Sequence, residues 1–394
     1  MALSLALIIL FGMLAGKLFE LLRLPALLGM LAAGILLGNT GFSVIHPDIM
    51  RIAPDLRIIA LVVILLRAGF GIDKEQLLRL GRPAVLLSFL PAAAEIAVIT
   101  AAAAVFLGLP LIEAALLGCV IAAVSPAVIV PAMLRMIEQR KGEDSGVPTL
   151  VLTAASADDV LVITLFSAAA GIYASGAVRP VMLMLSVPVS LAAGILAGAV
   201  TALLIMHLFD RFPMRDTKKT LVILSSLILL YQLEGAVADV VPMASLLGVM
   251  TVGFVLHQRE RQITLGLAAK FSKIWIFAEL MLFVLIGAQV EFAAARDAGW
   301  IGFMLILFGL AARSIGVLLA LVKTPVSTRH RWFAVAALTP KATVQAAVGA
   351  VPLAMGVPSG ELILALSVLS IMLTAPLGSV AIRVLSRRWF PPES

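Results

Sequence analysis

Long apolar runs constrain this chain more than any other feature of its sequence. Runs of roughly 20 mostly apolar residues, the length that a helix needs to cross a bilayer, recur from one end of the chain to the other. With 62% hydrophobic residues among 394, too little polar surface remains to cover a water-soluble globule. The sequence therefore predicts an all-α polytopic membrane protein whose solvent is the lipid bilayer, with no room for a soluble domain.

The apolar runs and the charged or Pro/Gly-containing breaks between them predict about 13 transmembrane helices. The expected ranges are 2–22, 25–42, 54–70, 83–108, 110–137, 147–173, 182–209, 219–234, 239–257, 270–291, 298–322, 331–355 and 359–386.

Basic residues test this segmentation, because alternate breaks must face the same side of the membrane. About 21 of the 29 Lys and Arg follow odd-numbered helices, as Arg140 does, and only about 4 follow even-numbered ones, as Arg57 and Arg179 do. Since cytoplasmic loops are the basic ones, the N-terminus is expected outside and the C-terminus in the cytoplasm.

The remaining composition excludes several classes of function. The single cysteine, Cys119, lies in an apolar run, so neither a disulfide framework nor a cysteine metal site is expected. The net charge of +7 is spread over short breaks and does not form a patch with aromatics, which argues against nucleic-acid binding. No nucleotide-binding glycine loop, nucleophile elbow or metal-ligand cluster is present, so we expect neither an enzyme nor a cofactor.

Two segments share a pattern of two small residues, an apolar residue, a hydroxyl and a proline. They are Ala122-Ala123-Val124-Ser125-Pro126 and Ala336-Ala337-Leu338-Thr339-Pro340. One lies in an odd and the other in an even helix, so they run in opposite directions, as an inverted-topology repeat requires. The whole chain, 1–394, then forms one transporter unit with repeats at 1–173 and 219–386 and a linking helix at 182–209.

The prolines of these segments predict two broken helices. A proline inside a helix removes a backbone donor and clashes with the preceding turn, and Pro126, Pro131 and Pro340 all stand within apolar runs. The freed backbone groups are tolerated at membrane depth only where they line a cavity or are buried in protein. Broken helices at corresponding places in two halves indicate a transport site near the middle of the bilayer.

Two adjacent carboxylates, Asp158 and Asp159, stand near the centre of the helix expected at 147–173. A charge at that depth costs on the order of 3 kcal/mol. The two also repel one another, so at least one is expected to bind a proton near neutral pH. Such a group can exchange a proton for a cation, and Thr153 and Ser156 are nearby hydroxyls that could support it.

Further charges lie in the middle of other helices. Glu95 and Arg313 occupy helices that the repeat makes symmetry mates, so they could form an ion pair that holds those helices in register. Lys341 follows Pro340 and could balance the aspartates or cap the carbonyl end of a half helix. Lys17 and Arg67, nearer helix ends, are expected to reach the headgroups, and Glu279 is given no role.

Three stretches of this sequence resemble the NHA-type sodium/proton antiporters of the monovalent cation/proton antiporter superfamily. They are Ala123-Val124-Ser125-Pro126-Ala127-Val128-Ile129-Val130-Pro131, Ser156-Ala157-Asp158-Asp159 and Thr339-Pro340-Lys341-Ala342-Thr343-Val344-Gln345-Ala346-Ala347. The opening stretch 24–38, LPALLGMLAAGILLG, is also similar to theirs.

The resemblance implies an NhaA- or NapA-like fold with two crossing broken helices and a homodimer in a bacterial inner membrane. It implies that Na⁺ or Li⁺ and H⁺ compete for Asp159, the principal ligand, and Asp158, its partner, with Glu95, Arg313, Lys341, Ser125, Pro126, Thr339, Pro340, Thr153 and Ser156 as supporting site residues. Arg313 stands where electrogenic relatives carry a lysine, a departure that favours electroneutral exchange.

Three other functions compete with Na⁺/H⁺ antiport. The first is K⁺/H⁺ exchange, because ion identity depends on cavity size and ligand number. The second is Na⁺-coupled uptake of an organic anion by a similar architecture, for which neutral ion ligands would be expected. The third, a passive pore or scaffold, has no use for costly central charges.

Overall fold

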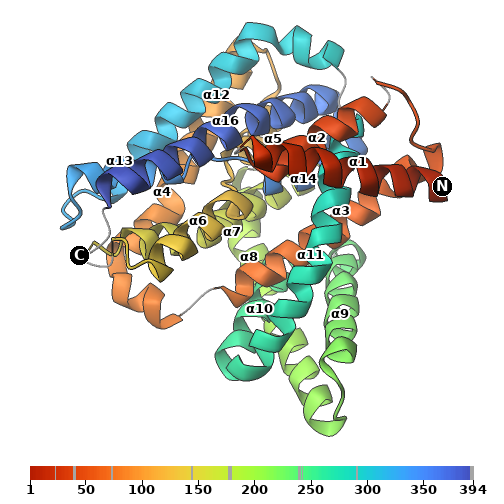
Figure 1. The fold of residues 1–394 in the computed structure, drawn as a ribbon, viewed down its shortest axis with the longest axis vertical. Coiled ribbons are helices and arrows are strands. Elements are labelled where there is room, and N and C mark those ends of the chain that lie inside the picture. The colour runs from red at the N-terminus through yellow and green to blue at the C-terminus, as the bar shows by residue number, and fades with distance from the viewer. Residues whose placement is uncertain are drawn as a thin grey trace. The chain divides into compact units, whose positions relative to one another are not determined.

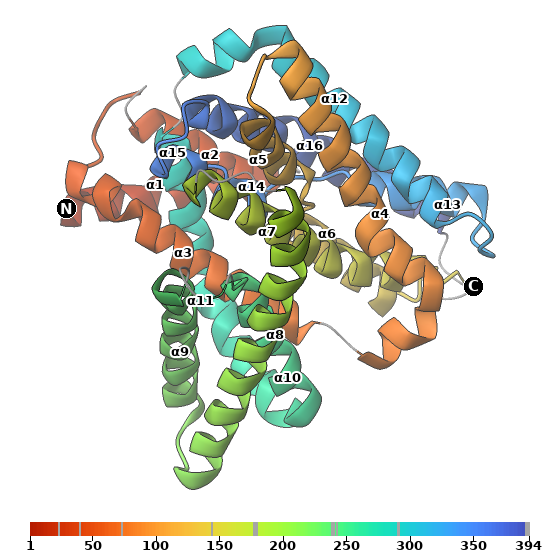
Figure 2. The same ribbon diagram turned by 180° about the vertical axis from the view of Figure 1, so that it is seen from behind.

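The computed structural model describes residues 1–22, 24–38, 41–71, 74–142, 145–175, 180–237, 241, 243–289 and 292–390, and within them every regular element is a helix (Figures 1 and 2). The helices are α1 (Ala2–Leu21), α2 (Ala26–Leu37), α3 (Pro47–Phe70), α4 (Lys74–Phe106), α5 (Leu111–Ala122), α6 (Pro126–Glu138), α7 (Val147–Ser175), α8 (Pro180–Arg211), α9 (Asp216–Val237), α10 (Ser245–Arg259), α11 (Arg261–Gln289), α12 (Phe292–Ala320), α13 (Thr328–Ala337), α14 (Thr343–Val348), α15 (Val351–Ala354) and α16 (Gly360–Trp389).

Each expected range overlaps a helix or an interrupted set of helices, but several helices begin earlier than predicted. α3 begins at Pro47 rather than 54, α4 at Lys74 rather than 83, and α11 at Arg261 rather than 270. Charged residues occupy these first turns, and two of the expected ranges begin at a proline, Pro54 and Pro83. A helix can continue beyond the hydrocarbon, where water satisfies polar side chains. Hydropathy therefore locates the membrane-spanning part of a helix and not the residue at which the helix begins.

One loop charge was placed wrongly. Arg57 was counted among the breaks, but it lies inside α3 and is only 6% exposed. Arg179, used in the same charge count, lies outside the described residues.

Seven helices in the described part of the chain are long and apolar enough to cross a membrane. They include α1, α9 and α16 in full and the segments Gly81–Phe106, Val189–Arg211, Thr264–Gln289 and Gly299–Ala320. By contrast α5, with 12 residues, is about 18 Å long, well short of the roughly 30 Å of hydrocarbon. Such a helix crosses the bilayer only together with the segment that follows it.

α4 and α12 share an internal break at a glycine. Gly81 in α4 has φ 57° and ψ −140°, and Gly299 in α12 has φ 42° and ψ −132°. Positive φ strains residues that carry a Cβ, so glycine is the residue that permits these bends. Glu95 follows Gly81 by the same number of residues as Arg313 follows Gly299.

The chain forms two compact units. The first comprises residues 1–54, 77–162 and 280–394, and within it α16 packs against α5, α6, α12 and α13 (Figure 1). A buried apolar cluster in this unit includes Val124, Ile129, Met133, Phe333 and Phe390. The Phe390 ring contacts Phe333 at 4.8 Å between centroids, which fixes the end of α16 against α13.

The second unit comprises residues 55–76 and 163–279, in which α8 packs against α9 and α10. Two of its charged residues, Glu234 and Arg67, have local partners. Glu234 accepts hydrogen bonds from the backbone N–H and the hydroxyl of Ser245, and the guanidinium of Arg67 lies 5.7 Å from the centre of the Trp275 ring. Arg67 was expected to reach the headgroups. In the structure its guanidinium lies over an aromatic face.

Candidate functional site

Two interruptions in helical structure meet inside the first unit. α5 ends at Ala122, residues 123–125 are extended, and Pro126 begins α6. α13 ends at Ala337, residues 338–342 are not helical, and Thr343 begins α14. The Ser125 N–H donates to the Pro340 carbonyl over 2.8 Å, so the two interruptions touch. The breaks predicted at Ser125-Pro126 and Thr339-Pro340 are confirmed.

Pro126 explains where the first interruption ends. It is the first residue of α6, the position at which the missing N–H costs nothing and the fixed φ suits a helix. The proline therefore starts a second helix, and the chain before it is free to leave the axis of α5.

The carbonyl end of α5 collects donors from three side chains. The Ala122 oxygen accepts from Lys341 Nζ at 2.9 Å and from Arg313 Nη2. Gln345 Nε2 donates to the carbonyls of Val120, Ile121 and Ala123 at 3.0, 3.2 and 2.7 Å. A helix leaves its last carbonyls unpaired and carries partial negative charge there, so cations and amide donors stabilise this end.

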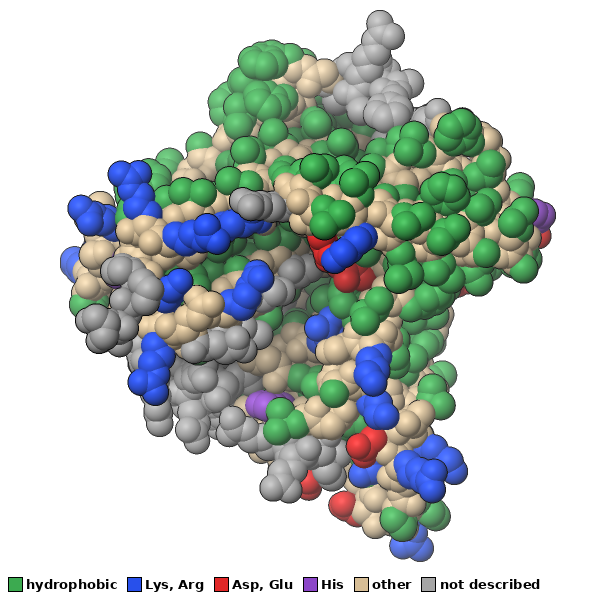
Figure 3. Space-filling view, viewed as in Figure 1, with side chains coloured by type: hydrophobic (Ala, Val, Ile, Leu, Met, Phe, Trp, Pro, Cys, Tyr) green, Lys and Arg blue, Asp and Glu red, His purple; other side chains and the backbone are tan. Residues whose placement is uncertain are grey.

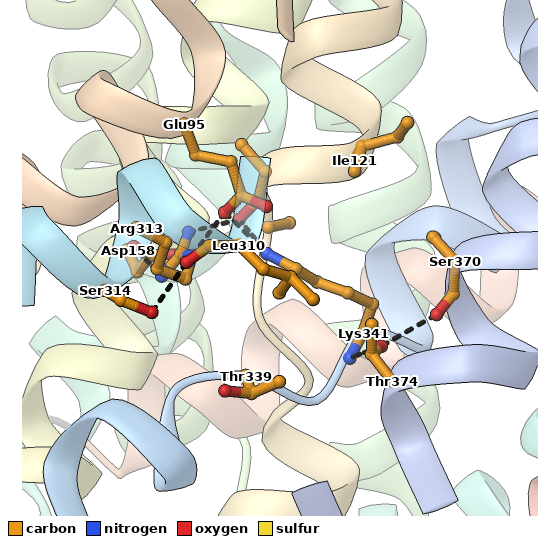
Figure 4. A network of polar contacts seen from close by, with 12 residues as sticks. Glu95, Ile121, Asp158, Leu310, Arg313, Ser314, Thr339, Lys341, Ser370 and Thr374 are labelled. Atoms are coloured by element: carbon orange, nitrogen blue, oxygen red, sulfur yellow. Dashed lines mark hydrogen bonds and ion pairs between the residues drawn. The ribbon is translucent and has the colours of Figure 1, made fainter. Parts of the chain in front are cut away.

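Glu95, Asp158, Arg313 and Lys341 form one buried network of charges, each at most 2% exposed (Figure 4). Arg313 Nε donates to Glu95 Oε2, while Nη1 and Nη2 lie 3.2 and 3.3 Å from the two oxygens of Asp158. Lys341 Nζ lies 2.7 Å from Glu95 Oε2. Arg313 thus joins the carboxylates of α4 and α7, and Glu95 joins both cations.

Two expectations for these residues have definite outcomes. Glu95 and Arg313 form the predicted ion pair. Of the two roles considered for Lys341, the ammonium takes the cap of a half helix, and its carboxylate partner is Glu95 rather than an aspartate.

Close approach of α4 and α12 makes the pair possible. A Cβ added at Gly316, one turn after Arg313, would lie 2.7 Å from the Cα atom of Pro91 on α4. Any residue other than glycine there would push the two helices apart and lengthen the Glu95–Arg313 contact.

Asp159 differs from its neighbour in forming no ion pair with any residue that the structure describes. It is 2% exposed, and its Oδ1 atom has no hydrogen-bond partner among the described residues. No ion pair to Asp159 occurs in that part of the chain, whereas Asp158 is held by Arg313. A buried carboxylate without donors is costly unless it binds a proton or a cation.

The hydroxyl residues of the predicted site have different surroundings. Thr339 Oγ1 donates to the Val335 carbonyl of its own helix at 2.9 Å. Ser125 Oγ is buried, with no hydrogen-bond partner among the described residues. Thr153 lies partly buried on α7, and the side chain of Ser156 lies outside the described residues.

The sequence analysis missed three members of the site: the Ala122 carbonyl, Gln345 and Thr374. The Lys341 N–H donates to Thr374 Oγ1 at 2.9 Å, and that hydroxyl donates to the Ser370 carbonyl at 2.7 Å. Gln345 lies four residues after Lys341, in the first turn of α14, and its closeness to Lys341 in the sequence could have identified it. A backbone carbonyl leaves no such signal in a sequence.

Comparison with known proteins identifies the family of this chain. The family model described as "Sodium/hydrogen exchanger, transmembrane" matches residues 5–388. Human sodium/hydrogen exchanger 9B2 is 34% identical over 96% of this chain and 73% of its own length, and human sodium/hydrogen exchanger 9B1 is 30% identical over 95% and 75%.

Among solved structures, the sodium proton antiporter MjNhaP1 from Methanocaldococcus jannaschii superposes with a TM-score of 0.81 over 95% of this chain and 98% of that one. Its 19% sequence identity shows a shared fold. The matched family model and the 34% identical relative together carry the assignment: this integral membrane protein belongs to the sodium/hydrogen exchanger family.

Proposed function

We propose that this protein exchanges Na⁺ or Li⁺ for H⁺ across the membrane by alternating access, with both ions competing for Asp159 and Asp158. The observation that carries the proposal is the contrast within that pair. Arg313 already neutralises Asp158, whereas Asp159 is equally buried and has an oxygen without a donor. A proton or a small cation on Asp159 would remove that cost.

The charges of the site favour one-for-one exchange. Three carboxylates and two cations leave one net negative charge in a buried site. One proton or one Na⁺ brings that charge to zero, so the two loaded forms have the same charge and each is cheaper to bury than the empty form. Such a site moves no net charge in a full cycle.

Arg313 supports the same conclusion. A guanidinium does not release its proton in proteins, so Arg313 cannot act as a second proton carrier in the way that a lysine could. Electroneutral exchange predicts that dissipating the membrane potential leaves the exchange rate in proteoliposomes unchanged.

The matched breaks support two inverted repeats at 1–173 and 219–386 with 182–209 between them. Gly81 and Gly299 interrupt α4 and α12 at equivalent points, and the next segment of each half is a broken helix. A site held where two broken helices touch can face either side when one repeat moves against the other.

The charge count supports a topology of 13 spans with the N-terminus outside and the C-terminus in the cytoplasm of a bacterial inner membrane. In a cysteine-free background, single cysteines near Arg140 and near Arg179 should be labelled from opposite sides. Labelling from one side would exclude both this topology and the inverted repeat.

We also propose a homodimer, on the basis of the resemblance to NHA-type antiporters. The mass of the protein in lipid nanodiscs, measured by light scattering, distinguishes a monomer from a dimer.

The test of the function is Asp159→Asn in everted membrane vesicles, with a pH-sensitive dye and added Na⁺, Li⁺ or K⁺. We expect exchange to be lost while the protein remains folded, because the site loses a titrating charge and keeps its packing. Asp158→Asn should weaken exchange equally or less. The matched control is Glu113→Gln, a buried carboxylate outside the charge network that accepts from the Ser359 N–H and should keep exchange. Wild-type exchange by Asp159→Asn would exclude this site, and a response to K⁺ alone would make the protein a K⁺/H⁺ exchanger.

A further inference from the structure

Gly378 of α16 lies directly against the ring of Pro340, the proline of the second break. A Cβ added at Gly378 would lie 2.3 Å from Pro340 Cγ and 2.8 Å from its Cδ, whereas carbon atoms in contact are ordinarily about 3.5–4.0 Å apart. Both residues are buried in the first unit, beneath a surface on which many hydrophobic side chains lie (Figure 3). Glycine is therefore the residue that fits at position 378 without displacing the break.

Thr374 holds the same break from one turn earlier on α16. Its Oγ1 accepts from the Lys341 N–H at 2.9 Å and donates to the Ser370 carbonyl at 2.7 Å, so the side chain is fixed against its own helix. Residues four apart lie on one face of a helix, so Thr374 and Gly378 form a single contact surface for the break. The hydrogen bond keeps the break close to α16, and the backbone of Gly378 determines how close it comes.

The position of Pro340 and Lys341 determines two contacts of the site. The Pro340 carbonyl accepts from the Ser125 N–H at 2.8 Å, which joins the two breaks. The Lys341 ammonium lies 2.7 Å from Glu95 Oε2 and 2.9 Å from the Ala122 carbonyl oxygen. Figure 4 shows the Lys341 side chain extending from the break toward Glu95. A displacement of the break at α16 would therefore move the ammonium within the charge network.

We infer that Gly378 is a positioning residue for ion exchange, because its missing side chain sets the place of the Lys341 ammonium among the carboxylates. This role depends on the ion exchange proposed above. A methyl group at 378 would force α16 and Pro340 apart by roughly 1 Å to restore an ordinary contact. The push on Pro340 points away from α16, toward the carboxylates that Lys341 faces, and a positive charge nearer to them repels a bound cation.

The experiment measures exchange by Gly378→Ala in proteoliposomes over a range of Na⁺ concentrations. We expect the Na⁺ concentration for half-maximal exchange to rise about 10-fold or more, since a misplacement of about 1 Å in a site costs up to about 100-fold. The maximal rate should change much less, because Asp158 and Asp159 themselves are unchanged. A wild-type half-maximal concentration in an exchanging Gly378→Ala protein would overturn the inference and leave the proposed function intact.

Two other glycines provide matched controls. In Gly198→Ala the added Cβ would lie 2.3 Å from the Gly248 carbonyl oxygen, an equally severe clash in the second unit. In Gly171→Ala no atom of a neighbouring described element lies within 4 Å of the added Cβ. Both variants should keep the wild-type half-maximal Na⁺ concentration, although Gly198→Ala should melt at a lower temperature. An equal rise in Gly198→Ala would mean that any packing defect weakens Na⁺ binding, against a positioning role for Gly378.

Pro340→Ala tests the contact itself. It removes Cγ and Cδ and leaves the Cβ atom, 3.2 Å from the methyl group added at 378. Gly378→Ala should therefore change the half-maximal Na⁺ concentration little when it is made in a Pro340→Ala background. The same 10-fold rise in both backgrounds would show that the proline ring is not what Gly378 accommodates.

Hydrogen exchange of the Lys341 amide needs no transport, so it tests the contact even in a protein that does not exchange Na⁺ for H⁺. The amide should exchange faster in Gly378→Ala, because separating α16 from the break lengthens the bond from the Lys341 N–H to Thr374. An unchanged rate would mean that Gly378 does not set the position of the break, whatever ion the protein carries.

Discussion

The two broken helices are alike in backbone and unlike in charge. Each is interrupted at a hydroxyl residue followed by proline, and a hydrogen bond joins the two interruptions. The carbonyl end of α5 accepts donors from Arg313, Lys341 and Gln345, whereas just after α13 the Thr339 hydroxyl donates to the Val335 carbonyl of that helix. All three donors belong to the second half of the chain.

This difference shows how two broken helices with similar backbones can contribute different chemical groups to one site. The second break supplies the Lys341 ammonium and the Gln345 side-chain amide, and the first break supplies the backbone carbonyl oxygens that accept from them. The two are therefore expected to respond unequally to substitution, and the following predictions test that asymmetry.

The largest effect is expected at the pair that joins α4 to α12. Glu95→Gln or Arg313→Gln should each destabilise the protein by roughly 3–5 kcal/mol, since each strands a buried charge. The double variant should recover much of that loss. Thermal melting of wild type, both singles and the double measures the coupling, with Glu113→Gln as a control. Additive losses would mean that Glu95 and Arg313 act independently.

Lys341 and Ser125 compare the side chains of the two breaks directly. Lys341→Gln loses two charge-assisted hydrogen bonds, each of which contributes about 1.5–3 kcal/mol. Ser125→Ala should change stability by less than about 0.5 kcal/mol, because its buried hydroxyl has no partner among the described residues. Denaturant titration of both variants checks this ranking. Comparable losses would show that the first break depends on its own side chain.

Gln345 and Thr339 compare the caps of the two helix ends. Gln345→Leu leaves carbonyls at the end of α5 without a donor and should cost about 1–3 kcal/mol. Thr339→Val should cost less, because its hydroxyl only shares a carbonyl already inside α13. Gln345→Leu should therefore have the lower melting temperature of the two variants. A lower melting temperature for Thr339→Val would argue against the asymmetry.

The smallest effect is expected at Thr374, which accepts from the Lys341 N–H. Thr374→Val keeps the shape and removes the acceptor, so a loss of about 1 kcal/mol is expected. Hydrogen exchange of the Lys341 amide should quicken in this variant. An unchanged rate would mean that Thr374 does not hold the second break.

Sequence patterns predicted those parts of the site that depend on charge and proline. Apolar runs do not accommodate Glu95, Arg313 or Lys341 without partners. The inverted repeat suggested that Glu95 pairs with Arg313. The partner of Lys341 was not predictable, because Glu95 and the aspartates are all carboxylates and only the geometry of the crossing selects among them.

Sequence patterns predicted the apolar helices, which hydrophobicity determines. They missed some helix starts and bends, which hydrophobicity does not determine. The early start of α11 carries charged residues that resemble a loop in a hydropathy reading, and the early start of α3 continues into Pro54, where a helix boundary is expected. The bend at Gly81 depends on one φ angle, and a single glycine in a helix is compatible with both a straight and a bent path.

One acceptor shared by Arg313 and Lys341, besides Glu95 Oε2, is the main-chain oxygen of Ala122. Side-chain mutagenesis cannot delete it, so scanning residue 122 would report on packing and overlook the group that both cations contact. Replacing the amide between residues 122 and 123 by an ester, through nonsense suppression with a hydroxy acid, would weaken that oxygen as an acceptor without altering any side chain at 122. One of the two oxygens that both cations contact is thus open to backbone chemistry and hidden from side-chain mutagenesis.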